Sequence, residues 1–136
     1  MNRRIVTALL TICILAAAPA LQAQQKTITI LVDVRSGIIM GRDTTSSEEL
    51  PKLLAERLWK SYLSTGKMYE RIEMITKGEV LMGTRGAVFD AIQRGQQIAL
   101  KRVCVYKYKK MYEDMDTAQQ ARVRKKFKVL FQETFS

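Results

Sequence analysis

The chain has 136 residues, with 23 Lys and Arg against 13 Asp and Glu, so its formal net charge is +10, and it contains no histidine. The lack of histidine excludes the imidazole base of hydrolytic triads, the paired histidines of zinc proteases and the usual ligand of transition metals. A chain of this length forms one domain and can bury a core without disulfides or metal.

The N-terminal residues have the three parts of an export signal: two arginines, an apolar stretch over residues 5–18 and small residues up to Ala23. We expect cleavage after Ala23, which gives a signal peptide over residues 1–23 and a periplasmic or exported mature domain over residues 24–136. An uncleaved anchor in the inner membrane remains the alternative. Residues 5–21 carry no charge and approach the length that spans a bilayer of roughly 30 Å.

Removal of the signal leaves 21 basic and 13 acidic residues, a net charge of +8, and a single cysteine, Cys104. No disulfide can form within the mature chain. The apolar neighbours Val103 and Val105 predict that Cys104 is buried. A basic domain outside the cytoplasm attracts anionic lipid, polyanionic cell-wall polymers or acidic protein faces, and we expect no nucleic-acid partner there.

The first half of the mature chain predicts a β-hairpin followed by a helix. Residues 27–34 alternate apolar and polar side chains as a half-buried strand does, and residues 38–40 supply its partner. A capping box at Ser46 and Glu49 begins a helix that Gly66 ends. Its apolar stripe repeats every four residues: Leu50, Leu54, Leu58 and Tyr62.

The second half predicts two further pairs of strand and helix. Residues 71–76 form a strand, and residues 84–100 have helical spacing. Gly95 weakens that helix by about 1 kcal/mol relative to alanine. A short strand over residues 103–106 follows, and Asp116 caps a last helix that runs to about Phe131.

The predicted order of elements is therefore β-β-α-β-α-β-α. Strands that alternate with helices of this length favour an α/β two-layer sandwich, in which a small mixed sheet has helices packed on one face. Residues 107–136 are expected to form a basic helical C-terminal extension of this single domain.

The residues that could carry catalysis have simpler explanations. Helix capping accounts for Glu48 and Glu49, and a solvated loop accounts for Glu113, Asp114 and Asp116. Cys104 has no imidazole to activate it. The glycine spacing matches neither phosphate-binding loop. We therefore expect no enzyme activity, no cofactor and no metal site.

Two basic clusters form a candidate surface for an anionic partner. They consist of Lys107, Lys109, Lys110, Arg122, Arg124, Lys125 and Lys126. The three lysines of the first cluster are interleaved with Tyr106 and Tyr108. This pattern suits an anionic surface, but we favour strand alternation, which explains it without any ligand, with the tyrosines packed on one face and the lysines pointing to water.

Several segments match the pattern of a known family. They are residues 28–32, 38–41, 47–51, 72–75 and 88–95. In this order they resemble the periplasmic domain of the ExbD/TolR family, whose members are accessory subunits of proton-driven energy-transducing complexes. Residues 110–120 are similar to a C-terminal extension of some ExbD-like proteins.

The resemblance implies the fold, a tendency to form a homodimer, and envelope or inner-membrane protein partners. It does not imply proton coupling, because residues 5–21 lack the acidic residue of the family's transmembrane helix. The sequence therefore predicts a non-enzymatic interaction domain of the cell envelope. Binding of an anionic cell-wall polymer or lipid through the basic clusters is the alternative.

Overall fold

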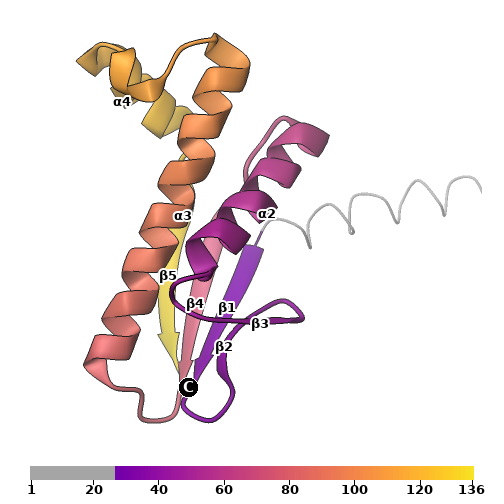
Figure 1. The fold of residues 1–136 in the computed structure, drawn as a ribbon, viewed down its shortest axis with the longest axis vertical. Coiled ribbons are helices and arrows are strands. Elements are labelled where there is room, and N and C mark those ends of the chain that lie inside the picture. The colour runs from indigo at the N-terminus through magenta and orange to yellow at the C-terminus, as the bar shows by residue number, and fades with distance from the viewer. Residues whose placement is uncertain (1–26) are drawn as a thin grey trace, which may run out of the picture.

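Apolar side chains on alternate residues make one face of the sheet hydrophobic. In the computed structural model, which describes residues 27–136, this pattern runs through β1 (Thr27–Asp33), β2 (Gly37–Met40) and β4 (Arg71–Lys77). Helices α2 (Leu50–Thr65) and α3 (Met82–Tyr108) cover that face (Figure 1). The predicted fold class, an α/β two-layer sandwich, is confirmed.

The sheet has the strand order β3-β2-β1-β4-β5, with β3 (Asp43–Thr45) and β5 (Leu130–Phe135) at its edges. β1 pairs with β2 in antiparallel register and with β4 in parallel register, and β5 continues the parallel half. Because β1, β4 and β5 run in the same direction, helices must return the chain between them. α2 and α3 supply these connections, α3 together with the short helices η1 (Tyr112–Asp114) and α4 (Thr117–Lys126).

The buried side chains form two clusters. The main core lies between the sheet and the two long helices and includes Ile30, Leu54, Met74 and Ile92. The second core contains more aromatic side chains. It joins the ends of α2 and α3 to α4 and consists of Trp59, Tyr62, Val103, Cys104, Met115, Val123 and Phe127. α4 is therefore packed against the long helices through its own apolar side chains.

The predicted stop of α2 and the cap of α4 are confirmed, whereas the capping box at Ser46 is only half present: α2 begins one turn later, with Glu49 as its N-cap and no side-chain cap hydrogen bond, because Pro51 is tolerated only in the first turn. The hydroxyl of Ser46 accepts a hydrogen bond from the backbone N–H of Glu49 (3.2 Å), and α2 ends at Gly66 in the left-handed conformation. Asp116 caps α4 by accepting from the N–H of Gln119 at 2.8 Å, and the Gln119 side chain completes the capping box.

The C-terminal third differs from the prediction. The expected strand over residues 103–106 is the last part of α3, because Ala99 and Val103 continue the four-residue spacing of buried side chains and no glycine or proline stops the helix there. The last helix ends at Lys126, and residues 130–135 form β5. The region 107–136 is therefore not a helical extension, since its final strand belongs to the sheet.

No helix within residues 27–136 is long and apolar enough to cross a membrane. The predicted signal peptide lies outside the described residues, so its cleavage remains a prediction.

Candidate anionic-partner site

The seven basic residues predicted from the sequence lie together at one end of the molecule. Lys107 is in the last turn of α3, Lys109 and Lys110 follow it, and α4 carries the other four: Arg122, Arg124, Lys125 and Lys126. All seven are exposed. Because α4 packs back on the second core, the two clusters, separate in sequence, share one end of the fold. In Figure 1 this end stands above the upper edge of the sheet.

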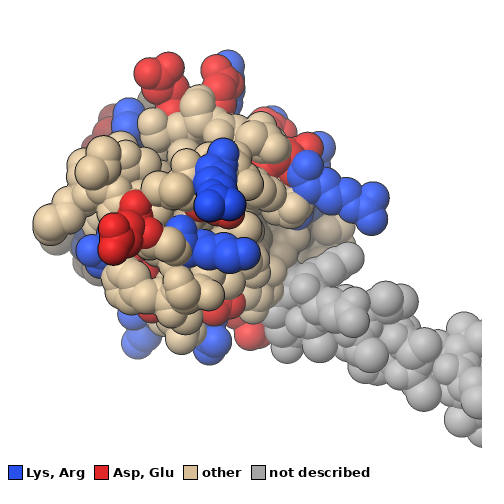
Figure 2. All heavy atoms as spheres, turned by 90° about the horizontal axis from the view of Figure 1, so that it is seen from below, with Lys and Arg blue, Asp and Glu red and all other residues tan. Residues whose placement is uncertain are grey.

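The charge of the protein is concentrated at this end. Residues 101–128, which we call the basic cap, contain ten basic and three acidic residues, a net charge of +7. Residues 27–100 contain ten basic and nine acidic residues, a net charge of +1. Figure 2 views the opposite end, where basic and acidic side chains are interspersed. The domain is therefore electrically polarised along its long axis.

The acidic residues of the basic cap do little to neutralise the seven cations. Glu113 pairs with Lys101 at 2.6 Å, and Asp116 is engaged as the cap of α4. Among the described residues, no ion pair involves any of the seven predicted cations. Their positive charge is therefore available to a partner.

Two of these cations are close enough to affect each other's protonation. The ammonium groups of Lys107 and Lys126 lie 5.5 and 5.7 Å from the centre of the same ring, that of Phe127. Their contact lowers the pKa of Lys107 and raises the pKa of Lys126, so Lys107 is the first of the two to lose its proton. An anion bound between these two groups would relieve their repulsion.

A pocket of about 430 Å³ opens between the end of α3 and α4. Its cationic side chains are Lys110, Arg122 and Lys126, and its apolar contacts are made by Met115 and Val123. Tyr108 and Gln119 complete the lining. Pockets of this size commonly hold small ligands. This one has the chemistry for an anionic group that is attached to an apolar body.

The sequence did not single out Met115 or Gln119 as members of this site. The spacing of residues along α4 could, however, have indicated Gln119. Once Asp116 fixes the start of α4, residues 119, 122 and 126 are spaced three and four apart and therefore share one helical face.

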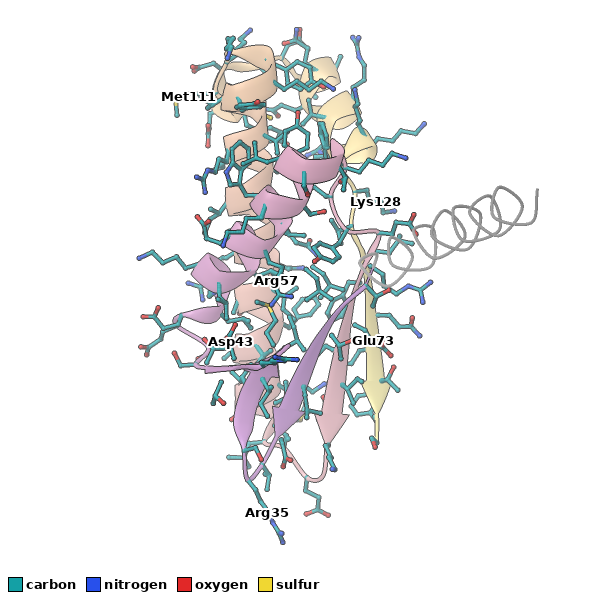
Figure 3. All side chains as sticks on the ribbon, turned by 90° about the vertical axis from the view of Figure 1, so that its right-hand side faces the viewer. Arg35, Asp43, Arg57, Glu73, Met111 and Lys128 are labelled. Carbon is teal, nitrogen blue, oxygen red and sulfur yellow. The ribbon has the colours of Figure 1, made fainter. Side chains whose placement is uncertain are left out.

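The tyrosines of the first cluster do not occupy one strand face, as the strand interpretation required. Tyr106 packs edge-on against Trp59, with ring centres 5.4 Å apart, while Tyr108 lines the pocket on α4. Met111 lies in the turn between α3 and η1 with 57% of its surface exposed. Figure 3 shows it near the upper end of the molecule, opposite to Arg35.

Other candidate chemistry is less well supported. Burial raises the pKa of the Cys104 thiol, which makes it a poor nucleophile. A general acid needs a raised carboxyl pKa, but hydrogen bonds from Lys101 and Arg85 lower the pKa values of Glu113 and Glu133. Within the described part of the chain, acidic and thiol side chains form no cluster suited to a metal ion.

Comparison with known proteins identifies no relative: no protein-family model, no curated protein and no solved structure matches this chain. The resemblance to the ExbD/TolR family therefore rests on the sequence segments alone.

Proposed function

We propose that this chain is a non-enzymatic interaction domain of the cell envelope that binds an anionic partner through its basic cap. The observation that carries the proposal is the net charge of +7 on residues 101–128, in which none of the seven predicted cations forms an ion pair within the described part of the chain. Envelope location rests on the N-terminal export pattern and on the resemblance to ExbD/TolR periplasmic domains.

The arrangement of these cations favours binding over a purely solubilising role. Solubility requires charge of either sign spread over the surface, as on the sandwich end of this domain. Here the cations gather on one end and surround a pocket with apolar walls. Two of them, Lys107 and Lys126, stay close together despite their mutual repulsion. A concentrated charge of this kind attracts and orients a partner of opposite charge.

The proposal is tested by reversing three charges of the pocket in one variant, Lys110→Glu, Arg122→Glu and Lys126→Glu. Each basic residue near an anionic surface contributes about 1 kcal/mol, so affinity for a polyanion should fall by about a hundredfold or more. The measurement is the salt concentration at which the mature protein elutes from heparin-agarose. The wild type should require much more salt than the variant.

A matched control reverses Arg35, Lys77 and Arg94 instead. These residues are exposed and belong to the sandwich, and their reversal changes the net charge equally. The control should elute close to the wild type. Equal losses in the two variants would show that net charge alone governs retention, and the proposed site would then be wrong.

A further inference from the structure

We propose that the basic cap docks on the surface of a bilayer that contains anionic phospholipid, with one lipid phosphate held in the pocket between Lys110, Arg122 and Lys126. This inference rests on the proposed function and names the partner of the same site. The side chains of Tyr108 and Met111 lie at the level of the lipid headgroups.

The apolar side chains of the cap distinguish a bilayer from a soluble polymer. Tyr108 and Met111 are 39% and 57% exposed, and they flank Lys109 and Lys110 in the sequence. A polysaccharide or polyphosphate chain gains little from an exposed methionine. A bilayer surface buries such side chains beneath the headgroups while lysines contact the phosphates, as in proteins that lie on membrane interfaces.

The pocket fits one lipid headgroup. The guanidinium of Arg122 can donate two hydrogen bonds to a phosphate, and the ammonium groups of Lys110 and Lys126 add two further positive charges around it. Met115 and Val123 offer apolar contact to the glycerol end of the lipid. Free phosphate would use the cations but not these apolar side chains.

The position of the cap relative to the start of β1 agrees with this docking. α3 has 27 residues and is about 40 Å long, whereas the seven residues of β1 span about 23 Å. α3 therefore extends beyond the sheet at the end where β1 begins (Figure 1). The cap is thus the part of this end that a flat surface would meet.

The experiment is sedimentation of the mature protein with vesicles of phosphatidylcholine, with and without phosphatidylglycerol. The wild type should bind only the vesicles that contain phosphatidylglycerol. The variant Met111→Ser, which leaves the pocket lining intact, should lose about tenfold in this binding, because it loses apolar area at the headgroup level. Its elution from heparin-agarose should stay unchanged, since every cation remains.

A control variant, Val34→Ser with Met82→Ser, removes exposed apolar side chains away from the cap and should bind the vesicles as the wild type does. Thermal unfolding checks that all variants remain folded. Retention on heparin without binding to phosphatidylglycerol vesicles would overturn the lipid proposal and leave the proposed function standing, with a soluble polyanion as partner. Failure of both would overturn both. Vesicle binding that is insensitive to Met111→Ser would also contradict the docking described here.

Discussion

The sequence and the structure assign different roles to Gly95. In sequence it weakens a helix, because glycine loses more backbone entropy than alanine. In the structure it is buried where α3 crosses α2. A Cβ atom at this position would lie 3.0 Å from the backbone oxygen of Pro51 and 3.0 Å from Cδ2 of Leu54. Glycine is therefore required by the close approach of the two helices.

We predict that Gly95→Ala destabilises the domain by about 1–3 kcal/mol, because overpacking against a backbone atom outweighs the gain in helix propensity. The control is Gly86→Ala in the same helix, where a Cβ meets no atom within 4 Å. That variant should be more stable than the wild type by up to about 1 kcal/mol. Urea denaturation measures both. Stabilisation by alanine at position 95 would show that the helices are not in close contact there.

At the scale of elements, one ion pair joins the edge strand to the helical layer. The guanidinium of Arg85, on α3, donates to both carboxylate oxygens of Glu133, on β5, and the second of these hydrogen bonds is 2.8 Å long. Arg85 also lies 4.8 Å from the ring centre of Phe135. β5 is bonded to the sheet along one edge only, so these contacts help to fix it.

This pair makes the stability of the domain depend on pH. Arg85 lowers the pKa of Glu133 in the folded state. The ion pair therefore contributes fully to the free energy of unfolding above the unfolded-state pKa of Glu133, about 4.3. This contribution is lost as the pH falls through the pKa of Glu133 in the folded state. Glu133→Gln should unfold at a lower temperature than the wild type near pH 7, and the difference should shrink as the pH falls below about 4.3.

Glu79→Gln serves as the control, because Glu79 is exposed and has no ion pair among the described residues. Its thermal unfolding should match that of the wild type near pH 7. A difference between Glu133→Gln and the wild type that persists at low pH would mean that shape, rather than charge, accounts for the effect.

The first part of the fold could be predicted because its local signals agree with one another. Strand alternation in β1, the polar turn at Ser46 before the helix and the stop at Gly66 all point to the structure observed. The end of α3 lacked such a signal. It stops at Lys109, a non-glycine residue with φ of 55°, and the valines before it favour a strand.

The candidate site was predicted in part. The seven cations could be named because exposed charge is visible in sequence. That they share one end depends on α4 folding back onto Trp59 and Tyr62 of α2, a long-range contact with no local signature. The pocket and the role of Met115 follow from the same contact.

At the scale of the whole molecule, the sandwich and the basic cap differ in charge and in the size of their buried cores. The sandwich is nearly neutral and contains most of the buried core, whereas the cap carries the excess charge on a small aromatic core of its own. This separation allows binding residues to be changed without disturbing the sheet. It also predicts that a bound anion affects one end of the domain and not the other.

The most direct test of the anionic-partner site is an NMR titration of the isotope-labelled mature domain with short-chain phosphatidylglycerol, below the concentration at which the lipid forms micelles. We predict that the backbone amide chemical shifts change within residues 107–126, with the largest changes around Lys110, Arg122 and Lys126. The chemical shifts of the amides of β1 and β4 should remain unchanged. Changes spread evenly over the domain, or concentrated on the sheet, would contradict it.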